Sequence, residues 1–295
     1  MEPAMRMFRL ILWLGLAVAT VSRSTNSVCG DEPVRDPPKP SAQVLKTPGG
    51  VAFALLGEKP GAPAPTLFVF AQEMQATLED GYFNKIGRLL APRGFLCVSL
   101  DIPCHGADAR PGEMPDQLTG WATRVRQDGN FVAPFTRRAS QVLDYLIAEK
   151  YTDPTRVAVA GSSRGGFIAL HTAAADERIR AVVAFAPVTH LPVLTEFAGL
   201  DQHEATLALS AIHLADKLAG KSVWTAIGNL DKRVGTDDCI ALTRAIVLAS
   251  ATKQTDENSA VPVELRVVPT ARHSIHPTAH DEAAAWLLQQ FSFKP

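Results

Sequence analysis

Short runs of consecutive apolar residues alternate with longer segments of helical periodicity along most of this chain. A strand buried on both faces appears as a continuous apolar run, and apolar residues repeated every three to four positions indicate a helix with one buried face. This alternation predicts an α/β fold with a mostly parallel central sheet and helices on both faces. We expect strands over residues 44–46, 51–56, 66–71, 95–100, 156–160, 181–186, 222–227 and 263–268, and helices over 82–91, 135–150, 167–175, 238–251 and 278–291.

Two long segments, residues 101–134 and 188–221, interrupt this alternation. Long insertions in compact domains are usually lids or binding loops. Both segments follow strands, and the carboxyl ends of parallel strands are where such sheets bind ligands. We expect residues 188–221 to form a small, partly helical cap whose apolar side chains line the site; an ordinary crossover helix lengthened by a loop is the alternative. These side chains are Leu191, Val193, Leu194, Phe197 and Leu200.

The first residues resemble a targeting segment. Arg6 and Arg9 precede an apolar run over residues 10–21, a pattern typical of a secretory signal peptide. The run is shorter than the roughly 20 residues that a membrane-spanning helix needs. We therefore expect a signal peptide over residues 1–27, a proline-rich linker over 28–43 and one domain over 44–295. The mature chain would be exported without a membrane span, although an uncleaved N-terminal anchor is an alternative.

Charge and cysteine content exclude several functional classes. The 295 residues include 29 basic and 30 acidic side chains, and the formal net charge is −1. The chain as a whole therefore has no electrostatic attraction to nucleic acid. Four cysteines are present without a Cys-x-x-Cys pair, so zinc and thioredoxin-like motifs are excluded. The sequence leaves open whether Cys104 forms a disulfide.

Residues 161–165, Gly-Ser-Ser-Arg-Gly, fit the pattern Gly-x-Ser-x-Gly between a predicted strand and a predicted helix. This setting is typical of a nucleophile elbow, in which a serine stands on a sharp turn above the sheet. Flanking glycines remove side chains that would collide across the turn. Ser163 is therefore the candidate nucleophile; the alternative is a strand-turn-helix whose glycines serve packing alone.

A serine nucleophile needs a base and an acid, which this kind of fold supplies in the chain order Ser, acid, His. His273 follows the last predicted strand and is the candidate base; His276 and His280, nearer to the final helix, are alternatives. Asp231 follows the preceding strand and is the candidate acid that orients the imidazole. Two alternatives to Asp231 resemble an N-cap pair of the next helix, namely Asp237 and Asp238.

At these residues the chain resembles the α/β-hydrolase superfamily, in particular the branch of dienelactone hydrolase-like and prolyl oligopeptidase-like serine hydrolases. The resemblance rests on residues 161–166 (Gly-Ser-Ser-Arg-Gly-Gly), 101–106 (Asp-Ile-Pro-Cys-His-Gly), 228–234 (Gly-Asn-Leu-Asp-Lys-Arg-Val) and the His273 loop. It implies an α/β-hydrolase fold, a Ser163–His273–Asp231 triad and a structural role for His105. Dienelactone hydrolases use a cysteine nucleophile, whereas this chain has serine.

The resemblance also implies an oxyanion hole made of two backbone N–H groups. The first is that of Arg164, directly after the serine. Many members carry His-Gly after the third strand, and the next residue donates the second N–H; here the stretch is Ala71-Gln72-Glu73. Glu73, or else Gln72, would have to donate. A carboxylate beside the oxyanion would oppose the developing charge unless it points away.

These residues predict acyl transfer to water with a small-molecule ester as substrate and without a metal or an organic cofactor. Peptidases of the related branch carry a large N-terminal propeller, and we expect none here, which favours an ester as substrate over a peptide. A small exported serine peptidase or acyl-peptide hydrolase is the alternative within the same class. A non-catalytic binding protein on a hydrolase fold is the alternative of another class.

Overall fold

The computed structural model describes residues 41–113, 118–254, 256 and 259–292. The expected signal peptide over residues 1–27 and most of the expected linker over 28–43 lie outside the described residues. The description below concerns the unit over residues 39–295.

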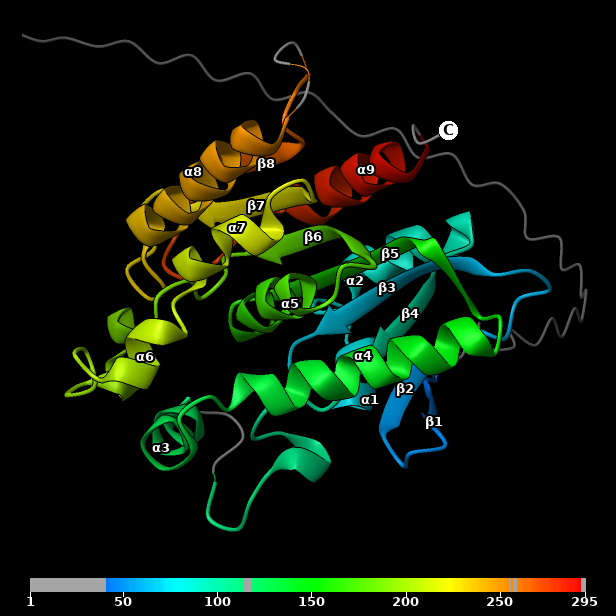
Figure 1. Ribbon diagram of the computed structural model, residues 1–295, viewed down its shortest axis with the longest axis horizontal. Coiled ribbons are helices and arrows are strands. Elements are labelled where there is room, and N and C mark those ends of the chain that lie inside the picture. The colour runs from blue at the N-terminus through cyan, green and yellow to red at the C-terminus, as the bar shows by residue number, and fades with distance from the viewer. Residues whose placement is uncertain (1–40, 114–117, 255, 257–258, 293–295) are drawn as a thin grey trace, which may run out of the picture. The chain divides into compact units, whose positions relative to one another are not determined.

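The core of this unit is an eight-stranded sheet with the strand order β1-β2-β4-β3-β5-β6-β7-β8. Strand β2 pairs with β1 and β4 in antiparallel fashion, and the other neighbours are parallel. β8 is the edge strand beside β7 (Figure 1). The strands are β1 (Gln43–Lys46), β2 (Ala52–Leu56), β3 (Ala64–Phe70), β4 (Leu96–Ser99), β5 (Thr152–Ser162), β6 (Ile179–Phe185), β7 (Ser222–Gly228) and β8 (Val263–Val268).

Helices cover both faces of the sheet. Buried side chains of α3, α4, α5, α7 and α8 belong to the cluster on one face, and those of α1, α2 and α9 to the cluster on the other. The prediction of a mostly parallel sheet between two helical layers is therefore confirmed. The helices are α1 (Met74–Glu79), α2 (Lys85–Leu90), α3 (Thr119–Asp128), α4 (Val132–Ala148), α5 (Arg164–Ala175), α6 (Glu204–Ala208), α7 (Ala215–Leu218), α8 (Thr236–Lys253) and α9 (Ala279–Ser292).

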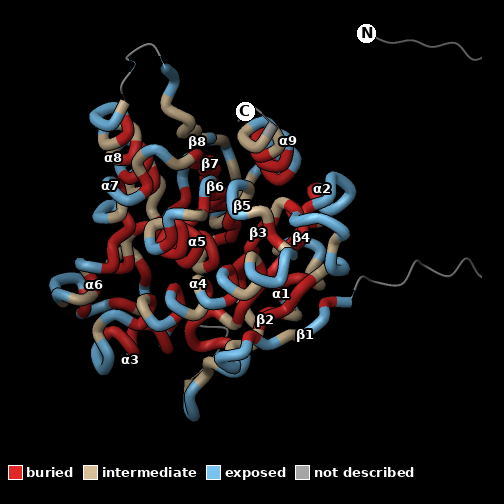
Figure 2. The backbone as a smooth tube through the Cα atoms, turned by 45° about the vertical axis from the view of Figure 1, so that its right-hand side comes forward, coloured by how far each residue is buried: buried red, intermediate tan, exposed pale blue. Residues whose placement is uncertain are grey.

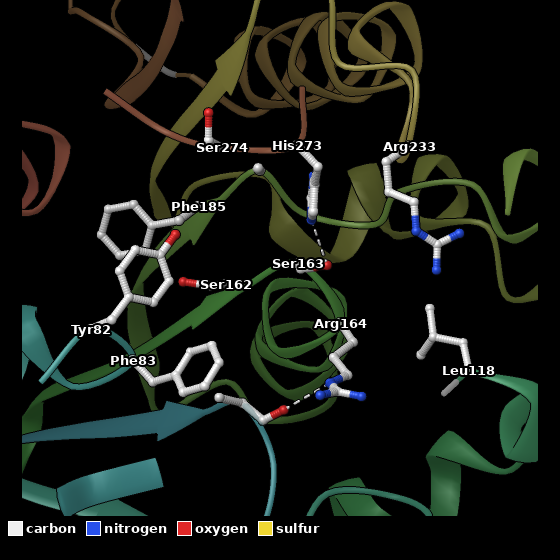
Figure 3. Close-up of a pocket in the computed structure, with 12 residues that line it drawn as sticks. Tyr82, Phe83, Leu118, Ser162, Ser163, Arg164, Phe185, Arg233, His273 and Ser274 are labelled. Atoms are coloured by element: carbon white, nitrogen blue, oxygen red, sulfur yellow. Dashed lines mark hydrogen bonds between the residues drawn. The ribbon is translucent and has the colours of Figure 1, made fainter. Parts of the chain in front are cut away.

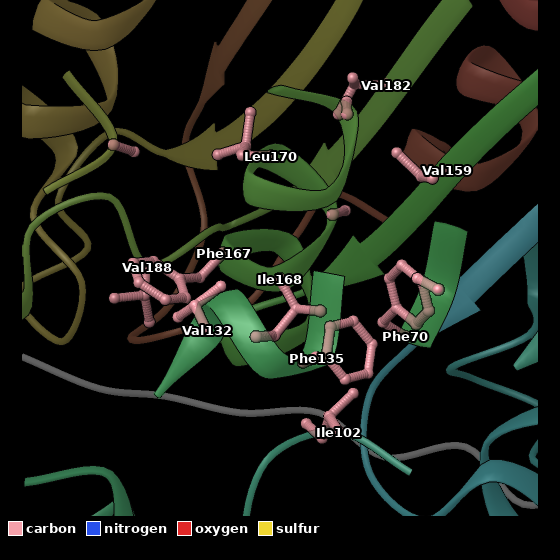
Figure 4. Packing of buried hydrophobic residues seen from close by; sticks show 14 of the residues in the cluster. Phe70, Ile102, Val132, Phe135, Val159, Phe167, Ile168, Leu170, Val182 and Val188 are labelled. Carbon is pink, nitrogen blue, oxygen red and sulfur yellow. The ribbon is translucent and has the colours of Figure 1, made fainter. Parts of the chain in front are cut away.

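Successive strand residues enter opposite clusters, as the alternation of side chains along a strand requires. In β3, Phe68 and Phe70 belong to the cluster on the α4 and α5 side, while Leu67 and Val69 belong to the other. The ring of Phe70 meets that of Phe135 from α4 edge-on, with centroids 5.2 Å apart (Figure 4). The strands inside the sheet are accordingly buried along most of their length, whereas the edge strands β1 and β8 are partly or fully exposed. Many other exposed residues lie in the outer loops (Figure 2).

The segment over residues 80–84 is a loop, although a helix was predicted from residue 82. The side chain of Asp80 accepts hydrogen bonds from the backbone N–H groups of Tyr82 and Phe83, both 2.7 Å long. Such Asx turns offer the backbone an alternative to a helix. The helix α2 therefore begins only at Lys85, and the two aromatic residues remain on a loop.

The expectation that apolar residues of the 188–221 segment line the site is wrong. The segment folds into short helical pieces, which include the 3₁₀ turns η3 (Leu191–Val193), η4 (Thr195–Phe197) and η5 (Ala211–Leu214). Leu191, Leu194, Phe197 and Leu200 are buried in the main core, because this segment covers that end of the α5 face. A cap role for the segment stays a prediction.

A buried ion cluster ties the segment after β4 to α3. The guanidinium of Arg124, whose side chain is 5% exposed, pairs with Asp108 and with Glu113. Its Nε and Nη2 donate to the two carboxylate oxygens of Glu113, both at 2.7 Å. Buried charges persist when each has a well-placed partner. Cys104, in the same segment, is a buried free thiol, as are Cys97 and Cys239, whereas Cys29 lies outside the described residues.

The turn between β5 and α5 has room only for glycines at two positions. A Cβ atom on Gly165 would lie 1.8 Å from the carbonyl oxygen of Phe70, at the end of β3. A Cβ atom on Gly161 would lie 2.2 Å from the backbone of Gly165. Both contacts are far shorter than atoms tolerate, so the glycines allow α5 to start directly against the sheet.

We expect Gly165→Ala to lower the free energy of unfolding by at least about 1–3 kcal/mol, because the new methyl group overpacks against backbone that cannot move aside. Urea denaturation of both proteins measures the difference. Gly61→Ala is the control, since nothing lies within 4 Å of the added atom. Equal stability of Gly165→Ala and the unaltered protein would contradict this account of the turn.

We expect Glu113→Gln to lower the free energy of unfolding by about 1–3 kcal/mol at neutral pH, because it removes one of the two carboxylates that pair with the buried guanidinium of Arg124. Hydrogen bonds from Arg124 lower the pKa of Glu113 from 4.5 to about 2. The carboxylate therefore stabilises the folded state above pH 4.5, and this stabilisation is lost as the pH falls toward 2.

Urea denaturation at about pH 7 and about pH 3 tests this sign, since the difference between the two proteins should shrink at the lower pH. Glu264→Gln, which removes a 41% exposed carboxylate paired with Arg266, is the control and should change little. A difference that grows on acidification would contradict the assignment.

Candidate active site

Ser163 stands on a strained turn between β5 and α5. Its backbone angles are φ 54° and ψ −115°, in a region that L-residues seldom occupy. Its N–H donates to the carbonyl of Phe185 at 2.8 Å, and its carbonyl accepts from the N–H of Val188 at 3.1 Å. Bonds to the neighbouring strand end thus hold the turn, and the hydroxyl is directed into a cavity.

A chain of two hydrogen bonds leads away from this hydroxyl. His273 Nε2 lies 2.9 Å from Ser163 Oγ, and His273 Nδ1 lies 2.7 Å from Asp231 Oδ2. A carboxylate only accepts hydrogen bonds, so Nδ1 carries the proton and Nε2 presents a lone pair to the serine hydroxyl. The three side chains that the sequence singled out are therefore brought together in the order that proton transfer from the serine requires.

Asp231 is buried, and backbone donors satisfy the rest of its carboxylate. Its side chain is fully inaccessible, whereas that of His273 is 29% exposed. The second oxygen, Oδ1, accepts from the N–H groups of Arg233 at 2.9 Å and Val234 at 3.3 Å. A buried charge with such partners is fixed in orientation, and Oδ2 is thereby presented to the imidazole.

The His273 loop is fastened to the end of β7. Thr270 Oγ1 donates to the carbonyl of Ser274 at 3.0 Å, which closes the loop after β8. A Cβ atom on Gly228 would lie 2.2 Å from Thr270 Oγ1, so the strand end and the loop are in close contact. Arg272, directly before the histidine, has a φ of 55°. Strained residues such as this one concentrate at functional sites.

The alternative candidates lie elsewhere. His276 is exposed and its Nδ1 contacts Thr278 Oγ1 at 2.8 Å. His280 is buried against the ring of Phe185, and burial lowers its pKa to about 4. Asp237 and Asp238 lie in the first turn of α8, whose N-cap is Gly235. The interpretation of these two as an N-cap pair is therefore wrong. The helix begins at Thr236, so both aspartates lie inside its first turn.

Two other histidines have structural surroundings. His105 Nδ1 lies 3.0 Å from the carbonyl oxygen of Pro103 in the segment after β4. His171, inside α5, lies 3.0 Å from the carbonyl oxygen of Leu209, and burial lowers its pKa to about 4. Both are buried, and for His105 this agrees with the structural role that the resemblance implies.

The cavity above Ser163 has a volume of about 330 Å³. Figure 3 shows aromatic side chains on one side of the serine and a leucine with two arginines on the other. The lining residues are Ala71, Tyr82, Phe83, Leu118, Ser162, Ser163, Arg164, Phe185, Ala186, Arg233, His273 and Ser274.

The sequence did not identify most of this lining. Arg233 lies two residues after Asp231, so its position beside the acid was a usable signal. Tyr82 and Phe83 were assigned to a helix, and the Asp80 turn that places them at the cavity is visible only in the structure. Leu118 comes from the long segment after β4, whose path no local pattern revealed.

The predicted oxyanion donors differ in how they are placed. The first N–H groups of a helix have no acceptor within it, and Arg164 is the first residue of α5. Its Nε donates to the carbonyl oxygen of Ala71 at 3.2 Å (Figure 3). The positive guanidinium thereby offsets the partial negative charge of that carbonyl oxygen near the serine. The helix start and the guanidinium thus both favour negative charge here.

After β3, the N–H of Gln72 donates to Thr77 Oγ1 at 3.0 Å, so Gln72 is engaged elsewhere. The carboxylate of Glu73 caps α1, where it accepts from the N–H groups of Gln75 and Ala76. It therefore does not oppose charge at the serine. In the turn after β3, Ala71 lines the cavity and Glu73 does not. That the Glu73 N–H donates to the oxyanion stays a prediction.

Within the described ranges, no group of three or more His, Cys, Asp or Glu side chains is arranged to hold a metal ion. No helix in the same part of the chain has the length and apolar character needed to cross a membrane.

Solved structures with the same fold include several hydrolases. The acetyl xylan esterase from Paenibacillus sp. R4 superposes with a TM-score of 0.63 at 19% identity, covering 87% of this chain and 86% of that one. A putative dienelactone hydrolase from Klebsiella pneumoniae gives 0.61 at 18% identity over 86% and 98%. Dipeptidyl peptidase 4 from Porphyromonas gingivalis gives 0.62 at 17% identity over 84% and 35%. These matches show the α/β-hydrolase fold that the sequence predicted.

A curated relative is similar over a shorter stretch. The 20-hydroxy-prefusarin hydrolase of Gibberella moniliformis is 34% identical over 113 residues, which are 37% of this chain and 23% of the relative. The chain thus matches less than a quarter of that relative's length.

The model of the prolyl oligopeptidase family matches residues 139–294, which carry the serine, the aspartate and the histidine described above. That stretch is more than half of the chain, so the protein is a serine hydrolase that belongs to the prolyl oligopeptidase family.

Proposed function

We propose that the protein hydrolyses carboxylic esters through an acyl-enzyme formed on Ser163. The observation that carries the proposal is the pair of hydrogen bonds from Ser163 Oγ to His273 Nε2 and from His273 Nδ1 to Asp231, 2.9 and 2.7 Å long. A nucleophile, a base within reach and a third group that orients the base are the parts that covalent acyl transfer needs.

In the first step, Ser163 Oγ attacks the ester carbonyl while its proton passes to His273 Nε2. Asp231 stabilises the imidazolium that forms and keeps the ring in place. When the tetrahedral intermediate collapses, the C–O bond to the alcohol breaks and His273 returns its proton to the alcohol oxygen. Water then repeats the sequence on the acyl-enzyme, releasing the acid and restoring the serine.

The negative charge of the tetrahedral intermediate needs donors that are already in place. We assign the first to the N–H of Arg164 at the start of α5. The arginine side chain, through its bond to the carbonyl of Ala71, keeps that carbonyl from repelling the oxyanion. The N–H of Glu73 is the proposed second donor, because Glu73 lies in the same turn as Ala71, which lines the cavity.

The size of the cavity supports a small substrate, since its volume of about 330 Å³ lies at the lower end of ligand sites. The fold shared with acetyl xylan esterase over most of both chains supports an ester. Peptide or acyl-peptide hydrolysis is the second candidate, and the match to the prolyl oligopeptidase family favours it. Rates on an ester and on the amide of the same acid and leaving group decide between the two.

We expect Ser163→Ala to abolish labelling by a fluorophosphonate probe and to lower the turnover of a short p-nitrophenyl ester by about 10⁴-fold or more. The matched control is Ser162→Ala, whose hydroxyl is buried and makes no hydrogen bond within the described residues; this variant should retain labelling. Absence of labelling in the unaltered protein would instead favour a non-catalytic binding protein.

We expect His273→Ala to lower kcat by about 10⁴–10⁶-fold and Asp231→Asn by about 10⁴-fold, because the asparagine no longer holds the correct imidazole tautomer. His276→Ala and Asp237→Asn are the matched controls, since these side chains lie outside the hydrogen-bonded chain and the cavity lining. Ester turnover under saturating substrate measures each effect. If only His276→Ala and Asp237→Asn lost ester turnover, His276 would be the base and Asp237 the acid.

A further inference from the structure

The two sides of the cavity differ in chemistry. Tyr82, Phe83 and Phe185 form an aromatic side, and Arg164 and Arg233 lie across Ser163 from them (Figure 3). Among the described residues that line the cavity, these two arginines carry the only formal charges besides what His273 gains on protonation. The state of the two guanidinium groups therefore decides which substrate charge the cavity accepts.

Arg233 is held by a carboxylate from another part of the chain. Its Nη2 and Nη1 donate to the two oxygens of Glu196 at 2.6 and 2.8 Å, and Nη1 also lies 3.4 Å from Thr195 Oγ1. Such a two-pronged arrangement fixes the plane of a guanidinium as well as its charge partner. The pair is partly shielded, with side chains 33% and 16% exposed.

Glu196 is ionised in this pair and rigidly placed. Burial raises the pKa of its carboxyl group, but the hydrogen bonds from Arg233, from a backbone N–H and from Thr195, together with the positive charge of Arg233, lower the pKa below its ordinary value. Glu196 lies in the 3₁₀ turn η4, which the buried side chains of Leu194 and Phe197 anchor in the core. The fold therefore fixes the position of the Glu196 carboxylate, which does not line the cavity itself.

A guanidinium has five N–H donors, and the bonds to Glu196 and Thr195 leave some of them for a ligand. A neutral acceptor such as a carbonyl oxygen can use these donors without disturbing the pair. An anion would have to share Arg233 with Glu196, whose charge repels it at short range. The pair thus offers hydrogen bonds on this side of the cavity with little net charge.

We propose that Glu196 is a specificity-determining residue: by neutralising Arg233, it makes the cavity prefer substrates that place a neutral hydrogen-bond acceptor beside Arg233 over substrates that place an anionic group there. The inference rests on the proposed ester hydrolysis and deepens it, since it names the class of substrate. It also gives the 188–221 segment a part in the site through one charge rather than through apolar lining.

The test compares kcat/KM for an ester that carries a carboxylate with that for its neutral methyl ester. Two such pairs cover both orientations of the substrate: p-nitrophenyl hydrogen glutarate with its methyl ester, and 4-acetoxybenzoate with methyl 4-acetoxybenzoate. We expect Glu196→Gln to raise the ratio of anionic to neutral substrate about tenfold in at least one pair. Arg233→Gln should lower the ratio in the same pair, because it leaves the carboxylate of Glu196 unpaired.

Asp144→Asn is the matched control, because it removes a carboxylate partner from Arg178, an arginine about as exposed as Arg233. Arg178 directly precedes β6 and thus lies at the end of that strand that is far from the cavity. Its ratio should equal that of the unaltered protein.

Fluorophosphonate titration first counts active sites in each variant. A protein that is not labelled argues against the proposed function, whereas fully labelled variants with unchanged ratios overturn the role of Glu196. If Glu196→Gln does not fold, the ratio in Arg233→Gln decides: a decrease supports the proposal and an unchanged ratio overturns it.

Discussion

The start of α5 lies so close to the end of β3 that the backbone at residue 165 has no space for a side chain. This contact forces a sharp turn at Ser163, whose φ of 54° is the strain that the turn stores. Hydrogen bonds from the end of β6 hold the turn closed. Most other features of the site follow from it, because the serine, the first N–H of the helix and the arginine after the serine are all placed by one backbone path.

The architecture was readable from the sequence because each buried strand is a local pattern. The strand predicted over residues 156–160 runs over Thr152–Ser162, and the helix predicted over 135–150 runs over Val132–Ala148. Both depend on apolar periodicity, which burial on a regular element enforces. The short helix Met74–Glu79 gave no such signal, since its six residues are too few to show a period.

The side chains that meet at the cavity were predictable only where the topology dictates their position. Loops after parallel strands gather at one sheet edge, so the loops after β7 and β8 had to bring Asp231 and His273 near the serine. No such rule connects Glu196 with Arg233, or Arg124 with Glu113. These pairs join segments whose path depends on tertiary packing. The apolar residues around Glu196 predicted a cavity lining, but in the structure they belong to the hydrophobic core.

Ser163 and its base His273 are held by parts of the sheet that differ in burial. Ser163 follows β5, a central strand paired on both sides, whereas His273 follows β8, an edge strand with only β7 beside it. Most residues of β8 are partly exposed, and edges of this kind open more readily than centres in native proteins. A brief detachment of β8 would carry the imidazole away while the nucleophile stayed in its turn. The margin of the sheet, rather than its centre, is therefore where we expect heating first to separate the imidazole from the serine hydroxyl.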